Sequence, residues 1–269
     1  MSQTDPKGTA LITGASSGIG AVYADRLARR GHDLILVARD ETRLNALAGR
    51  LRATYGVAVL TAPADLSSEA GLAAIERRLE SDPSIGVLVN NAGIGVLGTF
   101  LETSPENINA LIALNVLAAT RLAAAASRAF VPRGQGTIIN IASVLALVTE
   151  RFNPVYNATK SFVLSLSQSM QHEIGPRGIR VQAVLPGVTR TEIFSRAGGD
   201  IAGYPPEMVM EAGEMVDAAL AGLDQSEAVT IPSLPDAAAF EIFTQARLAL
   251  APNLSRNHAA ARYQVKAAL

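Results

Sequence analysis

Short apolar runs alternate with longer helical patterns along the first two thirds of the chain. The runs are rich in Val, Ile and Leu and are bounded by Gly, Asp or Asn; they occupy residues 10–13, 34–38, 57–61, 87–89, 137–141 and 181–185. Runs of this kind are typical of parallel strands that helices cover on both faces. The order predicts an α/β fold, a doubly wound (Rossmann) parallel sheet of about seven strands with helices on both faces. A seventh short strand is expected near residues 229–231.

A chain of 269 residues, 49% of them hydrophobic, is long enough for one large domain. We therefore expect a single Rossmann-type domain over residues 1–269, with the cofactor-binding part at about 7–190. The remainder, about 190–269, is expected to hold a substrate loop and C-terminal helices. Within it, Pro205 and Pro206 break the helical pattern, and residues 235–269 are typical of a helix followed by an Ala-rich tail.

Several classes of function are excluded by the composition. The formal net charge of −1 gives no electrostatic footprint for nucleic acid, and the absence of cysteine excludes disulfides, thiolate zinc sites and a cysteine nucleophile. The three histidines are isolated, so we expect no metal. The polar first residues lack the apolar stretch of a signal peptide, which favours the cytoplasm. The apolar region 111–126 is interrupted by Asn115 and Arg121 and is short for a bilayer, so we expect no membrane partner.

A glycine-rich turn follows the first apolar run directly. It runs from Thr13 to Gly20 as Thr-Gly-Ala-Ser-Ser-Gly-Ile-Gly, with three residues between the first two glycines, and a helical pattern comes next. Such a turn lets the backbone approach a pyrophosphate, and the helix N-terminus offers unpaired N–H groups to its charge. The turn predicts a dinucleotide site; a turn made for tight helix–strand packing alone has the same sequence pattern.

The residues at the end of the second apolar run bear on the choice between NAD(H) and NADP(H). An NAD site carries a carboxylate there, which bonds the adenosine ribose 2′-hydroxyl. In this chain Ala38 leaves room at that place, and Arg39 can hold a 2′-phosphate through charge-assisted hydrogen bonds. Asp40 is expected to cap the following helix. We therefore favour NADP(H) over NAD(H), the alternative for Arg39 being a solvated surface charge.

With these features the chain resembles the short-chain dehydrogenase/reductase family, in its NADP-preferring form. The family's motifs appear in its own order and spacing: T-G-x-x-x-G-I-G at residues 13–20, N-N-A-G at 90–93, an Asn at Asn115, the Ser, Tyr and Lys at Ser143, Tyr156 and Lys160, and P-G at 186–187. The resemblance covers residues 9–191, and the C-terminal third carries no family motif. It implies a hydride transfer between a nicotinamide cofactor and a carbonyl or alcohol.

The resemblance also implies the site residues. Ser143, Tyr156, Lys160 and Asn115 are expected to be catalytic, with Lys160 also binding the nicotinamide ribose and Asn115 holding a water that relays protons. The expected cofactor-binding residues are Gly14, Ser16, Ser17, Gly18, Ile19, Gly20, Arg39, Asp65, Asn91, Ala92, Gly93, Tyr156, Lys160, Pro186, Gly187, Thr189 and Thr191. Asp65 resembles the residue that contacts adenine, and a helix N-cap is an equally good local interpretation of it. Asn90 is expected to tie strand ends together.

The chemistry of the pair Tyr156 and Lys160 can be argued from spacing. Four residues apart on a predicted helix, the two side chains share one face. A free tyrosine titrates near about 10 and is a poor acid–base catalyst at neutral pH. A nearby ammonium, together with the positive charge of an oxidised nicotinamide, favours tyrosinate and lowers that pKa. Ser143 follows the fifth predicted strand and can donate a hydrogen bond to the substrate oxygen.

The substrate and the assembly are less constrained by the sequence. The candidate lining residues are apolar and favour a hydrophobic ketone or alcohol, although they could equally belong to the core: Ile94, Val96, Leu145, Leu147, Phe152, Val155 and Phe194. Arg151 or Arg196 could instead address an anionic group. The Ala-rich helix around residues 118–126 and the helix near Tyr156 resemble the pair at the family's dimer interface, so we expect a homodimer or homotetramer.

Three functions remain open at this point. The first is an NADPH-dependent reductase of an apolar ketone or aldehyde, with Tyr156 as the acid. The second is an NAD-linked alcohol dehydrogenase. The third is a nucleotide-binding sensor that kept the fold without turnover, since a fold alone does not establish a function.

Overall fold

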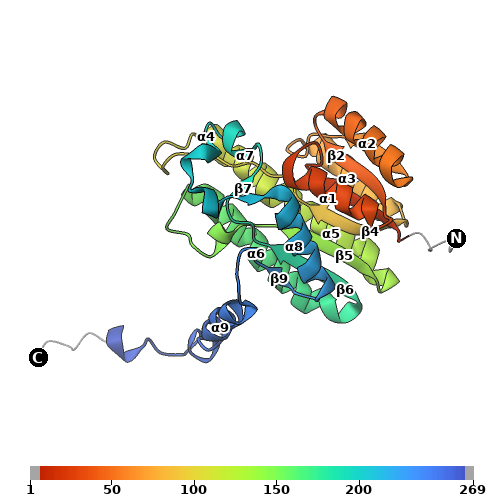
Figure 1. Cartoon of the computed structure of the whole chain (residues 1–269). Coiled ribbons are helices and arrows are strands. Elements are labelled where there is room, and N and C mark those ends of the chain that lie inside the picture. The colour runs from red at the N-terminus through yellow and green to blue at the C-terminus, as the bar shows by residue number, and fades with distance from the viewer. Residues whose placement is uncertain (1–6, 264–269) are drawn as a thin grey trace, which may run out of the picture. The chain divides into compact units, whose positions relative to one another are not determined.

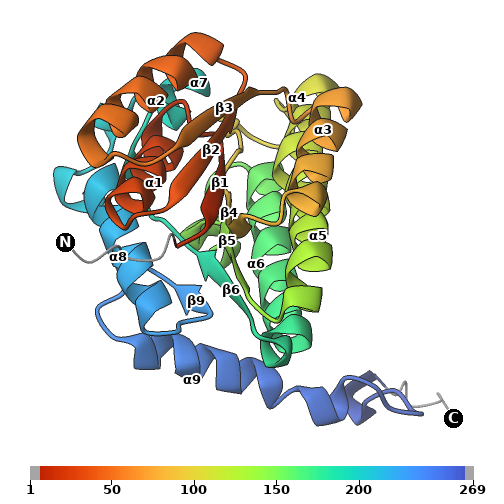
Figure 2. The ribbon, with the colours of Figure 1, turned by 90° about the vertical axis from the view of Figure 1, so that its right-hand side faces the viewer.

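A seven-stranded parallel sheet lies at the centre of the computed structural model, which describes residues 7–263 (Figure 1). Its strands follow the order β3-β2-β1-β4-β5-β6-β9 (Figure 2). Their bounds are β1 Thr9–Thr13, β2 Asp33–Ala38, β3 Val59–Pro63, β4 Ile85–Asn90, β5 Gly136–Ile141, β6 Ile179–Val184 and β9 Val229–Thr230. The predicted doubly wound sheet is confirmed. The third strand begins two residues later than predicted, and the Ala58 amide just before it donates to the Asp33 carboxylate at 2.8 Å.

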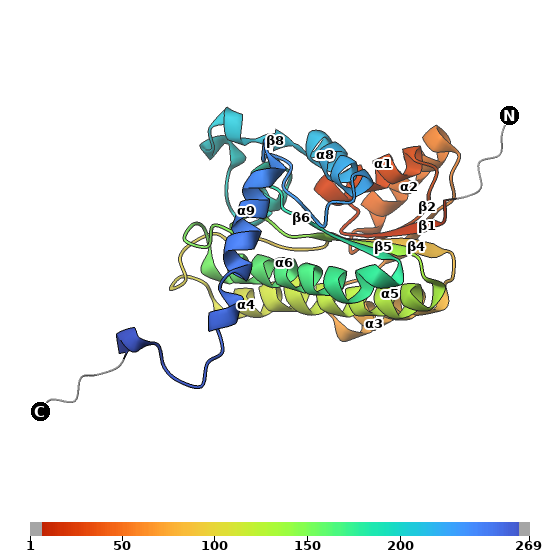
Figure 3. The ribbon, with the colours of Figure 1, turned by 90° about the horizontal axis from the view of Figure 1, so that it is seen from below.

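Helices cover both faces of this sheet, as Figure 3 shows. On one side lie α1 (Gly18–Arg29), α2 (Glu41–Tyr55) and α8 (Ala212–Asp224); on the other lie α3 (Glu69–Ser81), α5 (Ala119–Phe130) and α6 (Pro154–Ile174). Alternate residues of each strand pack against the helices on the two faces of the sheet. Ile12 of β1 belongs to the core under the first set of helices and Leu11 to the core under the second. This alternation explains why the strands are apolar throughout.

Between β4 and β5 the chain runs through one continuous helix, Pro105–Arg133. It comprises α4 (Pro105–Leu111), a π-helical segment (Ile112–Ala118), α5 and a short 3₁₀ turn. By length and composition alone it is the one helix of residues 7–263 that could span a membrane. Its Leu122, Ala126 and Phe130 are fully buried in the core against the sheet, as in a core helix of a globular fold. The continuous helix is longer than the apolar region considered from the sequence.

The order of the strands places a functional site. β1 lies between β2 and β4, so the chain leaves β1 for one neighbour and returns later to the other. At such a topological switch point the loops after the two strands diverge and leave a crevice at their carboxyl ends. The glycine-rich turn and the residues after β4 therefore meet at this edge.

The segment after β6 holds the predicted loop and helices. It contains β7 (Thr189–Arg190), α7 (Ile193–Arg196) and β8 (Met210–Glu211), and β7 pairs with β8 in a small parallel sheet. A 3₁₀ turn begins at Pro206, where the sequence predicts a break.

The contacts of the chain define one unit through Pro232 and a second unit from Ser233 onward. The first unit carries both sheets. The second contains α9 (Ala237–Leu248), which Asp236 caps by accepting from the Ala238 amide. The expected helix in this region is thus present, and residues 264–269 of the expected tail lie outside the described residues.

Candidate active site

The hydroxyl group of Thr13 ties the ends of β1 and β4 together. It accepts hydrogen bonds from the backbone amides of Asn91 and Ala92, each at 2.9 Å, and donates to the Val89 carbonyl at 3.3 Å. The Asn91 side chain donates to the Thr13 carbonyl at 2.8 Å and to that of Gly14 at 3.3 Å. These bonds hold the glycine-rich turn against the residues that follow β4, at the switch point of the sheet.

Helix α1 begins at this turn without a side-chain cap. Ser17 occupies the N-cap position, but it makes no capping hydrogen bond within the described residues. Three other long helices are capped by a side chain, α2 by Asp40, α3 by Ser68 and α6 by Asn153, whereas α8 also begins without one. The first N–H groups of α1 are thus available to a ligand, and an uncapped helix N-terminus favours an anion such as a pyrophosphate.

Close packing explains two glycines of the turn. A Cβ atom on Gly14 would lie 2.7 Å from the Asn91 side-chain nitrogen, and one on Gly20 would lie 2.3 Å from the Gly14 carbonyl oxygen. Gly14 also has a φ of 66°, which favours glycine. Gly20 is buried under the turn, so its position is structural, whereas Gly14 faces the cleft described next.

A cleft of about 710 Å³ begins at the turn and extends along the carboxyl ends of the strands. Eleven of the predicted cofactor residues line it: Gly14, Ser16, Ser17, Gly18, Ile19, Arg39, Asp65, Asn91, Ala92, Gly93 and Thr191. Ile94 and Val96, predicted to contact substrate, line it as well. The glycine turn, the uncapped helix and the length of the cleft fit a dinucleotide, whose pyrophosphate would lie at Ser17 to Ile19.

Arg39 lines the cleft beyond the end of β2, and Asp40 next to it caps α2 by accepting from the Arg43 amide at 2.9 Å, as predicted. Asp65 also lines the cleft. Its carboxylate accepts from the Ser67 hydroxyl at 2.6 Å and from the Ser67 amide at 3.0 Å. These bonds, with a smaller contribution from the charge of Arg39, lower the pKa of Asp65. The N-cap interpretation of Asp65 is wrong, because α3 begins later and Ser68 is its cap.

An ion-pair chain that the sequence analysis missed crosses the mouth of the cleft. Arg43 of α2 donates to both carboxylate oxygens of Glu192, at 2.9 and 2.8 Å. Arg196 of α7 bonds the same carboxylate at 2.5 Å and the Ser17 hydroxyl at 3.4 Å. The neighbouring arginines hold the pKa of Glu192 below its usual range, the hydrogen bond from Arg43 being the largest cause. The chain thereby joins α2, the glycine turn and α7.

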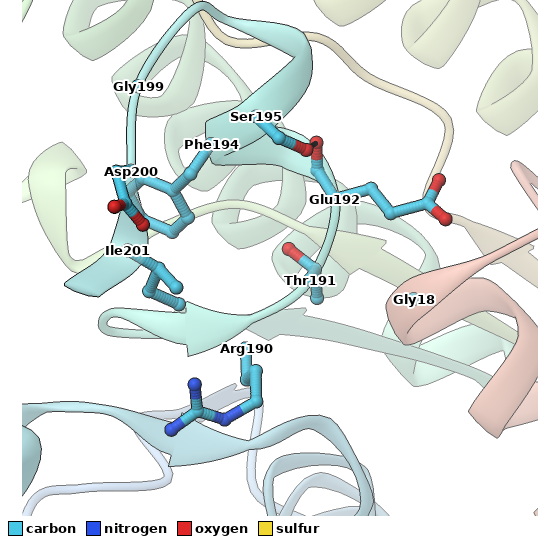
Figure 4. Close-up of a pocket in the computed structure, with 9 residues that line it drawn as sticks. All are labelled: Gly18, Arg190, Thr191, Glu192, Phe194, Ser195, Gly199, Asp200 and Ile201. Carbon is cyan, nitrogen blue, oxygen red and sulfur yellow. Dashed lines mark hydrogen bonds between the residues drawn. The ribbon is translucent and has the colours of Figure 1, made fainter.

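A second cavity, of about 370 Å³, shares Gly18, Thr191 and Glu192 with this cleft (Figure 4). Thr191 lies beside the turn at Gly18, where a Cβ atom would approach the Thr191 methyl to 3.2 Å. Phe194, predicted to contact substrate, lines this second cavity together with Ile201. Phe194 packs edge-on against Tyr204, with ring centres 5.4 Å apart.

Tyr156, Lys160 and Ser143 come together in the structure and are all buried. The Lys160 ammonium donates to the Ile141 carbonyl at 3.0 Å and lies 5.6 Å from the centre of the Tyr156 ring. Ser143 begins a 3₁₀ turn and accepts from the Leu145 amide at 3.2 Å, while its bond to the Pro186 carbonyl is long, at 3.5 Å. The Ser143 hydroxyl proton is therefore weakly committed and can be donated to a substrate oxygen.

Burial has the largest effect on the pKa values of Tyr156 and Lys160. It raises the pKa of Tyr156 to about 12, although a hydrogen bond with Ser143 acts in the opposite direction. Burial also lowers the pKa of Lys160 to about 8. The ammonium alone therefore does not lower the Tyr156 pKa as expected, because desolvation by burial disfavours the charged forms of both groups.

The catalytic group adjoins the cleft through two glycines. A Cβ atom on Gly93 would lie 3.6 Å from the Lys160 ammonium nitrogen, and one on Gly95 would lie 3.9 Å from Cε2 of Tyr156. Both glycines line the cleft. A ligand that fills the cleft past Gly93 would therefore reach Tyr156 and Lys160.

Asn115 lies in the π-helical segment and is buried. Its side-chain amide pairs with the backbone of Ile94, accepting from the amide and donating to the carbonyl, each at 2.9 Å. It also donates to the Thr159 hydroxyl at 3.2 Å, and that hydroxyl donates to the Tyr156 carbonyl at 2.7 Å. Thr159, missed by the sequence analysis, thus links Asn115 to the helix that carries Tyr156. π-Helical turns often occur at functional sites.

The remaining predicted residues have structural contacts. Pro186 accepts from the Val144 amide at 3.0 Å, Gly187 accepts from the Thr189 hydroxyl at 3.1 Å, and Thr189 begins β7. Asn90 ties β4 to β5, since its amide donates to Ala119 at 2.7 Å and to Asn140 at 3.2 Å. Leu147 packs on a small apolar core cluster, which favours the core interpretation for that residue.

Residues 7–263 contain no group of three or more His, Cys, Asp or Glu side chains placed to hold a metal ion.

Comparisons with known proteins agree with this geometry. A family model described as short chain dehydrogenase matches residues 8–201. The chain is 54% identical to a short-chain dehydrogenase from Sphingobium yanoikuyae solved in complex with NADPH, with a TM-score of 0.93 over 96% of this chain and 100% of that one. It is 48% identical to a bulky-bulky ketone specific alcohol dehydrogenase from Comamonas testosteroni, with a TM-score of 0.89 over 96% and 99% of the two chains.

More distant relatives include a very-long-chain 3-oxoacyl-CoA reductase from Mus musculus. It is 34% identical over 188 residues, which make up 68% of this chain and 60% of the mouse protein. The family match extends over strands β1 to β6, the glycine turn and the buried Ser143, Tyr156 and Lys160. The chain belongs to the short-chain dehydrogenase family of oxidoreductases.

Proposed function

We propose that this protein is an NADPH-dependent reductase of apolar ketones or aldehydes, with Tyr156 as the proton donor. One observation carries the proposal: the buried group of Ser143, Tyr156 and Lys160 adjoins a cleft that leads to an uncapped helix N-terminus and to Arg39. A buried proton donor has no use in a protein that only binds nucleotide, which disfavours the sensor hypothesis.

The residues divide the chemistry between them. NADPH, when bound, supplies the hydride that the carbonyl carbon accepts. Ser143 donates a hydrogen bond to the carbonyl oxygen, since its hydroxyl proton is weakly committed in the structure. Tyr156, protonated at neutral pH because its pKa is about 12, donates its proton to the oxygen as negative charge develops there.

Lys160 supports the proton transfer. Its ammonium is the positive charge nearest to Tyr156 on α6 and favours the tyrosinate that proton donation leaves behind. Asn115 lies next to this group, with its amide held by Ile94 and Thr159. We propose that it holds the water that returns a proton to the site.

The preference for NADPH rests on charge at the end of β2. Arg39 lines the cleft where the adenosine ribose of a dinucleotide would lie, and the charge next to it is the cap Asp40, whose carboxylate is engaged by α2. Arg43 and Arg196 lie at the same mouth, where both are paired with Glu192. The Sphingobium relative binds NADPH, which supports the same preference.

The preference for a hydrophobic ketone rests on the cleft and on the Comamonas relative. Ile94, Val96 and Leu114 line the cleft near Gly95, and that relative acts on bulky-bulky ketones. We also propose that residues 1–269 work as one oxidoreductase domain in the cytoplasm. Self-association through α5 and α6 is proposed as well, because Leu117 and Phe162 are large exposed apolar residues on or next to these helices.

A fluorescence titration with NADPH and, separately, NADH tests the cofactor. We expect clearly tighter binding of NADPH, and Arg39→Ala should remove most of that difference. Arg50→Ala, which changes another exposed arginine on α2, is the matched control. Equal or tighter binding of NADH by the unmodified protein would place an NAD-linked alcohol dehydrogenase first. Loss of NADPH absorbance with a panel of aryl ketones then tests the reaction.

A further inference from the structure

The ring of Tyr156 has two neighbours that differ in size, the aromatic ring of Phe152 and the glycine Gly95. The Phe152 ring packs edge-on against Tyr156 with centres 5.6 Å apart and planes at 69°. A Cβ atom on Gly95 would lie 3.9 Å from Cε2 of Tyr156 and 3.5 Å from Cγ1 of Ile193. A ketone whose oxygen meets the Tyr156 hydroxyl must place its two substituents with respect to these features.

Phe152 is held in place at a conformational cost. Its φ is 65°, and only one other non-glycine residue in the described part of the chain, Ser226, has a positive φ. A bulky residue in this left-handed region is strained and persists only where the surroundings impose it.

Two buried asparagines impose that conformation. The Asn157 amide donates to the carbonyls of Thr149 and Arg151, just before Phe152. Asn153, just after it, caps α6 and donates to the Thr103 hydroxyl at 2.8 Å. Both asparagines are 1% exposed, so the strained residue lies between two buried anchors. The fold thus keeps a strained backbone at Phe152, and this conformation places an aromatic ring beside the proposed proton donor.

At Gly95, in contrast, neither backbone strain nor a close contact requires a glycine. The distances from its imagined Cβ to Tyr156 and Ile193 are ordinary van der Waals contacts, so an alanine would fit without displacing either neighbour. Its backbone needs no glycine, since its φ is not among the positive values. The missing side chain therefore leaves about one methyl group of space between Tyr156 and Ile193, open to the cleft.

We propose that Gly95 admits the larger substituent of the ketone and that Phe152 limits the size of the smaller one. The inference rests on the proposed reduction of ketones and names the residues that set its substrate range. The larger group lies along the cleft with one edge over Gly95, where a methyl group would take up the space that it uses, and the smaller group ends against the Phe152 ring. A single added or removed methylene in such an apolar pocket changes kcat/KM by roughly 10- to 200-fold.

Two ratios of kcat/KM distinguish the role of Gly95, which concerns the larger substituent, from that of Phe152, which concerns the smaller one. The ratio of acetophenone to butan-2-one varies the larger substituent at a constant methyl group. The ratio of butyrophenone to acetophenone varies the smaller substituent at a constant phenyl group. Ratios are used because a general loss of active protein cancels in them.

We expect Gly95→Ala to lower the first ratio by about tenfold and to leave the second ratio within about twofold. Phe152→Ala should raise the second ratio by about tenfold and leave the first unchanged. Gly49→Ala, at an exposed position of α2 with open space around it, is the control and should change neither ratio. Phe152→Gly removes the ring and also accepts a positive φ, so it should reproduce the ratios of Phe152→Ala and melt at a higher temperature.

The proposal is overturned if both variants shift the same ratio, or if Gly95→Ala lowers kcat/KM for all three ketones equally. If Phe152→Ala does not fold, Phe152→Gly tests whether the Phe152 ring limits the size of the smaller substituent. Failure of the proposed function gives a different result: the unmodified protein would bind NADPH and reduce none of the three ketones, so that no ratio could be measured. Active unmodified protein with unchanged ratios in both variants would refute the present inference alone.

Discussion

The ammonium nitrogen of Lys160 lies 5.6 Å from the centre of the Tyr156 ring, and both side chains are buried. Burial lowers the pKa of Lys160 to about 8 and raises that of Tyr156 to about 12. Each group is thus moved toward its neutral form. Burying two titratable groups side by side costs stability, which fits a site made for a reaction.

Replacement of Lys160 by Met should stabilise the fold at neutral pH. The folded pKa of Lys160 lies below the unfolded value, so the unfolded chain binds more protons between pH 8 and about 10.5 and stability rises with pH there. Below pH 8 the charged lysine costs about 3 kcal/mol by this linkage, and Met carries no such cost.

Urea unfolding of both proteins from pH 7 to pH 11 checks this. The advantage of Lys160→Met is expected to shrink by about 3 kcal/mol across that range. A constant difference between the two proteins would mean that the burial of Lys160 carries no proton linkage.

Loss of the Thr159 hydroxyl should disturb Asn115. In Thr159→Val one N–H of the buried Asn115 amide loses its acceptor, which is expected to cost about 1–3 kcal/mol of unfolding free energy. Thr159→Ser keeps the hydroxyl and should recover most of that stability. If proton return passes by Asn115, the valine variant should also lower kcat more than it changes KM. Thermal unfolding and kinetics of the two variants side by side check both points; equal behaviour of Val and Ser would contradict them.

Gly20→Ala and Gly49→Ala should change the stability of the protein in opposite directions. In Gly20→Ala the new methyl would lie 2.3 Å from the Gly14 carbonyl oxygen, a clash with backbone that must shift the glycine turn. We expect a loss of several kcal/mol of stability, or of NADPH binding, or of both. Gly49→Ala meets nothing within 4 Å in the middle of α2 and should stabilise by about 0.5–1 kcal/mol. Melting temperatures of the two variants check the pair, and a stable, cofactor-binding Gly20→Ala would refute the assigned close approach.

Local patterns predicted the elements that depend on local physics. The six apolar runs and the edge strand became the seven strands because a strand covered on both faces must be apolar throughout. Asp40 caps α2 as its place before the helix indicates. The cap of α3 was misplaced because Asp65 and Ser68 are both good caps, and only the loop geometry, with Ser67 bonded to Asp65, selects Ser68.

Features that depend on tertiary contact could not be predicted in this way. Arg43 and Glu192 are 149 residues apart and meet only because β7 and α7 return to the mouth of the cleft. Arg43 lies in the first turns of α2, shortly after Arg39 in the sequence, and this could have pointed to the second arginine. The π-helical segment at Asn115 and the raised pKa of Tyr156 follow from packing and burial, which periodicity does not report.

The rate of NADPH consumption with a reducible aryl ketone, measured for the unmodified protein and for Tyr156→Phe, tests the central claim most directly. Both proteins should bind NADPH with nearly the same affinity, because the cleft and the helix N-terminus are unchanged. Tyr156→Phe is expected to lose at least about a hundredfold in kcat, the contribution of a general acid. Tyr55→Phe, which removes a hydroxyl bonded to Asp25 elsewhere in the fold, should keep full activity. Full activity of Tyr156→Phe would contradict the account.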